Sequence, residues 1–231
     1  MIKLKITWRY CLAFYCIIML YASLHELVHH FAGYLVCGDW GTKTFNSFST
    51  TCDNEAKSYI ATYIGPLFSF GMMYVGMYFL RQNNSAFKKH LGFAMIFAQL
   101  PFQRMVSPFF RMNDEFYASS KLFGNTDVVY WIVIILIWLI CLPPLIKAYK
   151  VIQNKYKWLW YAFYLVLFPY VLWGPFFGGL EYLMVEKKFL DYPIIGIGLL
   201  FIINEIVTIV AYYYTKKYIN PHKKYTSFNR H

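Results

Sequence analysis

Charged residues are scarce in this chain. Asp, Glu, Lys and Arg make up 14% of its 231 residues, whereas 59% are hydrophobic and the mean hydropathy is +0.40. Soluble domains carry about 25% charged residues, so this composition excludes an ordinary soluble protein. Several apolar runs exceed the ~18 residues that a membrane-crossing helix needs. The sequence therefore predicts an integral membrane protein with little chain left for a soluble domain.

The apolar runs divide the chain into about six segments that are long enough to cross a bilayer. No internal repeat or low-complexity linker separates them, so we expect a single transmembrane domain over residues 1–231. The predicted fold class is all-α, a polytopic helical bundle. The predicted spans are 8–36, 58–80, 91–110, 128–148, 158–179 and 193–214.

Acidic residues are missing from four segments that hold most of the basic ones. The chain has 22 Lys and Arg but 11 Asp and Glu. Because basic residues mark cytoplasmic loops, this pattern predicts that both termini are cytoplasmic. The net charge of +11 is therefore explained by membrane topology and by contact with the lipid bilayer. Nucleic-acid binding is not expected, because no recognition motif accompanies the charge. The basic residues concerned are Lys3, Lys5, Arg9, Arg81, Lys88, Lys89, Lys147, Lys150, Lys155, Lys157, Lys216, Lys217, Lys223, Lys224 and Arg230.

There are only five cysteines. Cys11, Cys16 and Cys141 fall within predicted spans, where packing explains them. Cys37 and Cys52 both fall in the first loop on the side opposite the basic segments. A disulfide there is one interpretation if that loop is extracytoplasmic. Two unpaired thiols or a second metal contact are the alternatives.

His25, Glu26 and His29 form an H-E-x-x-H pattern near the end of the first apolar run. Residues four apart lie on one face of a helix. Two imidazoles there can bind one Zn²⁺, and the glutamate beside them can act as a general base. Titratable groups inside a membrane are costly unless they have a function. The pattern predicts His25 and His29 as metal ligands, Glu26 as the catalytic base, and His30 as a neighbouring support.

Chain direction suggests a third ligand. The first span starts inside, and about 22 Å of helix separate Tyr10 from His25, so the histidines lie in the outer part of the bilayer. The third predicted span ends at the same level, and Asp114 follows it. We therefore predict Asp114 as the third ligand, with Glu115 as the alternative.

The third predicted span also contains Gln99, Gln103 and Arg104. Such a span must face the bundle interior or a water-filled cavity. We expect Arg104 to be an interior salt-bridge partner. Arg104 or Asn113 could also orient a carboxylate or stabilise an oxyanion.

Three further features are singled out. The polar loop 38–57, beside the histidines, is a candidate lid or substrate-guiding element. Gly65-Pro66 predicts a kink or a new helix start within the second span. Glu205, in the middle of the last span, is a functional candidate by default, but we expect a buried pair with Arg or Tyr.

The six histidines are too few for other metal chemistry. Membrane di-iron enzymes use several histidine boxes, and His29-His30 has no second box to join. A b-type haem needs histidines that face each other from different helices, whereas His90 lies at the opposite surface from His25. His222 and His231 fall in the tail.

The assembled motifs resemble those of the site-2 protease family of intramembrane zinc metalloproteases. His25, Glu26 and His29 match the family's first motif. Gly65-Pro66-Leu67-Phe68 matches the start of its Gly-Pro-x-x-Asn motif, with Ser69 where the family usually has Asn. The resemblance thus implies supporting roles for Gly65 and Pro66.

The third motif of that family, Asn-x-x-Pro followed by Asp-Gly, matches less well. This chain has Ser107-Pro108 and then Asn113-Asp114-Glu115. The resemblance covers residues 10–115, which it implies are a three-helix metalloprotease core, while residues 116–231 add three spans and a basic cytoplasmic tail. Many members place the zinc nearer the cytoplasm, whereas the charge pattern here places it toward the extracytoplasmic side.

The resemblance implies a zinc-dependent metalloendopeptidase whose substrate is a membrane protein or a membrane-adjacent peptide. One alternative is a non-catalytic membrane protein that has a structural metal site or binds client helices. Another is a metal-ion transporter, which would need a polar path through the bundle. The sequence indicates neither the substrate nor the oligomeric state.

Overall fold

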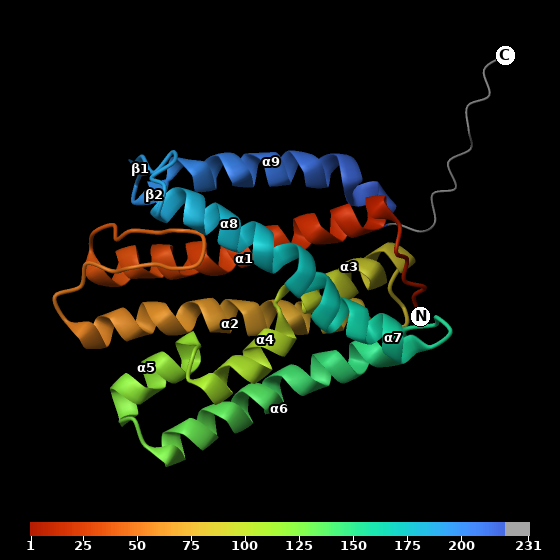
Figure 1. Cartoon of the computed structure of the whole chain (residues 1–231). Helices are drawn as coiled ribbons and strands as arrows, with labels where there is room; N and C mark the ends of the chain where they lie inside the picture. Colours follow the sequence, from red (N-terminus) through yellow and green to blue (C-terminus); the bar gives the residue numbers. More distant parts are fainter. Residues whose placement is uncertain (220–231) are drawn as a thin grey trace.

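The fold, a computed structural model that describes residues 1–219, is helical apart from one short hairpin (Figure 1). This confirms the predicted all-α class. Among these residues, five helices are long and apolar enough to cross a membrane. They are α1 (Trp8–Cys37), α2 (Glu55–Phe79), α6 (Asp127–Val151), the helical run Lys157–Val185, and the run Leu199–Tyr218 that contains α9 (Leu199–Thr215).

The outer faces of these helices suit a lipid environment. Large apolar side chains are exposed along α6 and α9, where water would disfavour such continuous patches. The exposed residues include Ile132, Ile135, Leu136, Ile206, Val207 and Val210. The length and composition of the helices, together with these faces, indicate an integral membrane protein.

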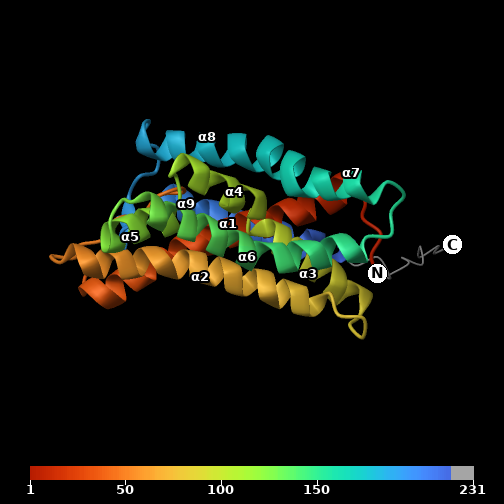
Figure 2. The ribbon, with the colours of Figure 1, turned by 90° about the horizontal axis from the view of Figure 1, so that it is seen from below.

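The described basic segments gather at one end of the bundle. In both views, the N-terminus, the 80–85 turn, the 152–156 connection and the end of α9 lie together (Figures 1 and 2). The backbone N–H of Ile2 donates to the carbonyl of Val151 at 2.8 Å and fixes part of this arrangement. The clustering agrees with the topology argument, although which side is cytoplasmic stays a prediction. Lys223, Lys224 and Arg230 lie outside the described residues.

The third predicted span is not one helix, so the crossing expected over 91–110 needs correction. Leu100 has a left-handed backbone, with φ 51° and ψ 51°. The next residue, Pro101, lacks an N–H and disfavours a helical conformation before it. The chain therefore enters the bundle in short pieces. These are α3 (Ala86–Ala98), α4 (Pro101–Val106), η1 (Ser107–Phe110) and α5 (Asp114–Phe123).

Other prolines have different effects. α2 runs through Gly65-Pro66 without ending, so no new helix starts there. The run that contains Pro169 instead includes two π-helical turns, which break the regular hydrogen-bonding pattern. Its parts are α7 (Lys157–Ala162), η2 (Phe163–Leu167), η3 (Pro169–Trp173) and α8 (Gly174–Val185).

α1 lies inside the bundle and packs against α2, α3 and α9. Its N-terminal half enters the larger apolar core, which includes the aromatic rings of Tyr10, Phe14, Phe93 and Tyr164. At the other end, a hairpin of β1 (Pro193–Ile194) and β2 (Ile197–Gly198) receives the first loop: Lys43 N–H donates to the carbonyl of Gly196 at 2.8 Å. The polar half of α1 is thus enclosed by helices and by this loop.

Candidate metal centre

The two histidines of the H-E-x-x-H pattern lie on one buried face of α1. His25 is 8% exposed and His29 is 0% exposed. Their Nε2 atoms lie 3.1 Å apart, as their spacing of one helical turn requires. The pair therefore offers two ring nitrogens to one point inside the bundle.

Asp114 reaches the same point from the start of α5. Its Oδ2 lies 3.3 Å from Nε2 of His25 and 3.3 Å from Nε2 of His29. The broken third segment precedes this approach: α4 and η1 connect α3 to α5, and α5 packs against α2. Within the described residues, His25, His29 and Asp114 form a buried group that could hold a metal ion.

The three ligand atoms have the spacing of a tetrahedral site. Atoms about 2.0–2.1 Å from one zinc ion at tetrahedral angles lie about 3.3–3.4 Å from one another. The observed separations, 3.1, 3.3 and 3.3 Å, are close to that value. Two nitrogens and one carboxylate oxygen also suit zinc chemically. The residues present therefore fit such an ion.

The surroundings of His29 fix its ring. Its Nδ1 donates to the carbonyl of Ala61 at 2.8 Å, which leaves Nε2 unprotonated and able to bind metal. Phe48 stacks on the ring with centroids 4.3 Å apart. A Cβ at Gly65 would overlap the ring, so only glycine leaves room for His29 at this position. This contact gives Gly65 a physical role.

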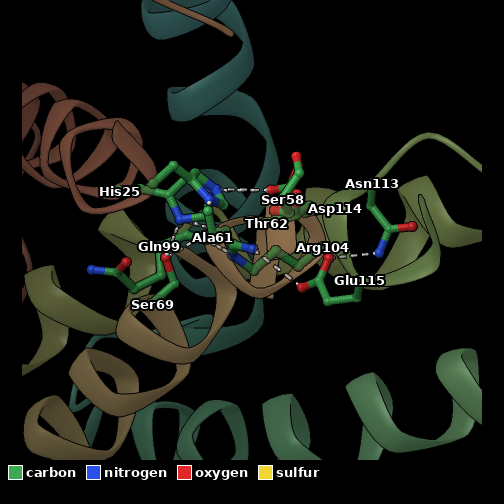
Figure 3. Close-up of polar contacts among 11 residues, drawn as sticks. His25, Ser58, Ala61, Thr62, Ser69, Gln99, Arg104, Asn113, Asp114 and Glu115 are labelled. Atoms are coloured by element: carbon green, nitrogen blue, oxygen red, sulfur yellow. Dashed lines mark hydrogen bonds and ion pairs between the residues drawn. The ribbon is translucent and has the colours of Figure 1, made fainter. Parts of the chain in front are cut away.

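His25 is oriented by Ser69 (Figure 3). Ser69 Oγ lies 3.0 Å from Nδ1 of His25 and accepts from Nη2 of Arg104 at 2.8 Å. If the hydroxyl oxygen accepts from both nitrogens, Nδ1 of His25 carries the proton and Nε2 is free for the ion. Arg104 Nη2 also lies 3.1 Å from Nδ1 and would donate to it in the other tautomer of His25.

Glu115 lies in a different network from Asp114. Its carboxylate accepts from Arg104 at 3.3 Å and from Asn113 at 2.7 Å, so it does not join the histidines (Figure 3). Arg104 is thus an interior salt-bridge partner, as predicted. Burial raises the pKa of Glu115. Burial also opposes the charged form of Asp114, but the contacts with the imidazoles of His25 and His29 outweigh burial and lower the pKa of that carboxyl.

Glu26 lines a cavity beside the three ligands. The cavity has a volume of about 360 Å³, and His25, Asp114, Asn46 and Phe177 also line it. Glu26 is half-buried, and its carboxylate makes no hydrogen bond to any residue in the part of the chain described. A carboxylate beside an open space and close to the ligands is available to a small molecule there.

The first loop covers the site. Cys37 and Cys52 form a disulfide across its base, which resolves the alternatives for these cysteines. At its tip, the carboxylate of Glu181 in α8 accepts from the Phe45 N–H and the Thr44 hydroxyl, each at 2.7 Å. Because Phe48 and Asn46 belong to the same loop, this anchoring fixes part of the wall of the metal centre.

Lys43 is buried in that loop, with 2% of its surface exposed. Its Nζ donates to the carbonyl of Thr44 at 2.9 Å and lies 3.2 Å from the ring centroid of Phe201. Burial lowers the pKa of Lys43 to about 7, against the opposing charges of Glu26, Glu205 and Glu181. The loop therefore brings the amino group of Lys43 close to one glutamate from each of α1, α8 and α9.

Two other candidates lie apart from the ligands. His30 Nε2 donates to the carbonyl of Ile195 at 2.9 Å, and its ring stacks on Trp40, so it supports the loops rather than the ligands. The expected Arg or Tyr partner of Glu205 was wrong. Ser23 donates to this carboxylate at 2.6 Å and Asn204 at 3.1 Å. Pro66 is buried in α2 next to Gly65.

Sequence reasoning missed Ser69, Phe48 and the carbonyl of Ala61 as parts of the site. Ser69 gave a signal, since it stands where the second motif usually has Asn. Phe48 and Ala61 gave none, because a ring in a loop and a main-chain carbonyl carry no recognisable pattern. They are found only through contacts with His29.

No protein-family model, curated protein or solved structure matches this chain. The function of the centre must therefore be inferred from its own residues.

Proposed function

We propose that this protein is an intramembrane zinc metallopeptidase, similar to site-2 proteases, that hydrolyses peptide bonds of membrane-embedded or membrane-adjacent substrates. The observation that carries the proposal is the convergence of His25, His29 and Asp114 at tetrahedral spacing, with Glu26 on the wall of the adjoining cavity. These are the residue types that hydrolytic zinc sites use.

Each residue has a defined task in this reaction. A bound zinc ion would supply Lewis acidity toward the scissile carbonyl and the attacking water. Glu26 takes a proton from that water on a carboxylate oxygen and then gives it to the nitrogen of the departing amine. The carbonyl of Ala61 holds His29 in the tautomer that binds metal, and Ser69 contacts Nδ1 of His25 on the side away from the ion. The surrounding helices limit access of bulk water.

The open side of the site favours catalysis over a structural metal. Structural zinc sites are closed by four protein ligands, whereas catalytic sites keep a position for water or substrate. Among residues 1–219, three ligands converge, and the cavity lies beside them. The carboxylate of Glu26 lines that cavity and accepts no hydrogen bond from the described residues.

The variant Glu26→Gln tests the mechanism. It should keep zinc and lose peptide cleavage, by about 10²-fold or more, because an amide cannot act as the base. The probe is a set of synthetic apolar peptides of about 20 residues in detergent micelles. The matched control is Glu186→Gln, an exposed acid that should cleave normally. Cleavage by Glu26→Gln at the wild-type rate would show that the mechanism is wrong.

The two alternatives give different results. His25→Ala should sharply lower the zinc content under every metal-binding hypothesis. Wild-type protein that binds zinc but cleaves none of the peptides would favour a structural site or client-helix binding. Zinc movement into proteoliposomes, lost in Glu205→Gln, would favour a transporter, because Glu205 is the acid in the middle of α9.

A further inference from the structure

Two buried polar atoms beside the metal centre have no hydrogen-bond partner among residues 1–219. They are Nε2 of Gln99 and Oδ1 of Asn113. Both residues line the same cavity as Glu26. Buried polar groups in folded proteins are almost always paired, so an unpaired group at a cavity indicates a missing partner. Here the unpaired groups are one donor and one acceptor.

Contacts with Arg104 and Glu115 restrain these two residues. Gln99 is 3% exposed and lies at the break between α3 and α4, where its main-chain carbonyl accepts from Nε of Arg104 at 3.1 Å. Asn113 donates from Nδ2 to Glu115 at 2.7 Å. Because a carboxylate only accepts, this contact fixes the amide of Asn113 with Oδ1 as the free acceptor.

The two amides flank the metal centre. Asn113 immediately precedes the ligand Asp114. Gln99 is linked to the ligand His25 through Arg104, which contacts both. In Figure 3, Gln99 and Asn113 lie on opposite sides of His25 and Asp114. A chain that passes over the centre would meet one amide on each side of it.

We propose that Gln99 and Asn113 are positioning residues that hold the main chain of a peptide across the metal centre; this inference rests on the proposed function. Gln99 donates to a peptide carbonyl, and Asn113 Oδ1 accepts from a peptide N–H. An uncharged donor and an uncharged acceptor together match a peptide unit. A peptide group away from water must find such partners. Because these hydrogen bonds involve only main-chain groups of the substrate, peptides with different side chains can bind.

Binding tests this inference separately from catalysis. The protein is the inactive Glu26→Gln variant in detergent, and the probe is a fluorescent apolar peptide of about 20 residues that wild-type protein cleaves. Adding Gln99→Met should weaken binding about five- to tenfold, because one hydrogen bond is lost and the side-chain size is kept. The matched control is Gln82→Met, an exposed glutamine in the distant turn, which should bind normally.

A backbone change in the peptide tests Asn113. Mass spectrometry first locates the bond that wild-type protein cleaves, and an ester then replaces each neighbouring amide in turn. One ester should weaken binding, since it removes the N–H that Asn113 accepts. The same ester should have no effect in the Asn113→Ala variant. In active protein, Gln99→Met should raise KM more than it lowers kcat.

The outcomes separate the two proposals. If wild-type protein cleaves the peptide but neither Gln99→Met nor any ester changes affinity, the amides hold only water and this inference is overturned, while the proposed function stands. If wild-type protein cleaves no peptide, the proposed function is wrong, and so is the proposed role of Gln99 and Asn113 in holding a peptide.

Discussion

The ring of His29 is constrained on three sides, and each constraint comes from a different part of the chain. Ala61 accepts its Nδ1–H, Phe48 covers one face, and Gly65 leaves space where any other residue would collide. A ligand held in this way keeps its orientation without the ion, which lowers the cost of binding metal. The affinity of the centre should therefore depend on residues that never touch the ion.

Gly65→Ala should lower the affinity for zinc about 10- to 100-fold, because its methyl group displaces the ring of His29. Gly71→Ala is a matched control, since it lies on the same helix with nothing within 4 Å of its Cβ position. Zinc titration of the purified variants measures the effect. Equal affinity in the two variants would contradict the role of Gly65.

Lys43→Met should stabilise the protein most at low pH. The pKa of about 7 lies below the usual 10.5 of lysine, so the unfolded state binds more protons between these values. Wild-type stability should therefore rise from about pH 7 to 10.5, and the cost of burying the charge is complete below pH 7.

The check for Lys43 is the difference in Tm between variant and wild type in detergent. It should be a few degrees at pH 6 and should shrink toward pH 10. A Tm difference that stays constant over this range would show that the pKa of Lys43 is not lowered in the folded protein. Lys121→Met, an exposed lysine, is the control and should show no such trend.

At this scale the sequence predicts some residues and not others. The spacing of His25 and His29 and the direction of the chain brought the ligands together with Asp114 before any contact was known. Lys43 and Phe48 could not be predicted in this way. Their roles depend on what the fold places beside them, and nothing in their local pattern distinguishes them from packing residues.

Among the elements, the polar loop 38–57 affects the metal centre most, because it covers the site. It is closed at its base by Cys37–Cys52 and anchored at its tip by Glu181. Because the loop supplies Phe48, its order and the order of His29 are linked. Loosening the loop should therefore weaken both the fold and the metal centre.

Reduction of the disulfide should lower stability by about 3 kcal/mol, as expected for a cross-link that closes a loop of this length. Zinc affinity should fall as well. Thermal unfolding in detergent, with and without reductant, measures the change. The double variant Cys37→Ser/Cys52→Ser serves as control, because reductant should not affect it. Stability that does not change on reduction would mean that the bond does not restrain the loop.

Helix boundaries show where hydropathy stops being a guide. The long apolar runs predicted α1, α2 and α6 within three residues at each end. The last span was predicted to begin at 193, which was wrong, because β1 and β2 occupy this stretch and α9 begins at Leu199. The run 91–110 is apolar enough to suggest a crossing, but Leu100 and Pro101 divide it. Its polar residues gave the better signal, since Gln99 is buried beside the cavity.

For the whole molecule, charge and redox chemistry agree. The described basic segments lie at one end of the bundle, and the end of α1, where Cys37 begins the disulfide, lies at the other (Figure 1). Disulfides persist in oxidising compartments, and basic loops stay in the cytoplasm. Both arguments place the metal centre toward the extracytoplasmic side, which remains our prediction for orientation.

The central claim is that His25, His29 and Asp114 bind one catalytic zinc ion inside the bundle. X-ray absorption at the zinc edge of purified protein, together with metal analysis, tests it most directly. We expect one zinc per chain with two imidazole nitrogens and oxygen ligands at about 2.0–2.2 Å, and a loss of zinc in Asp114→Ala. Protein without stoichiometric zinc, or zinc bound to sulfur, would contradict the account.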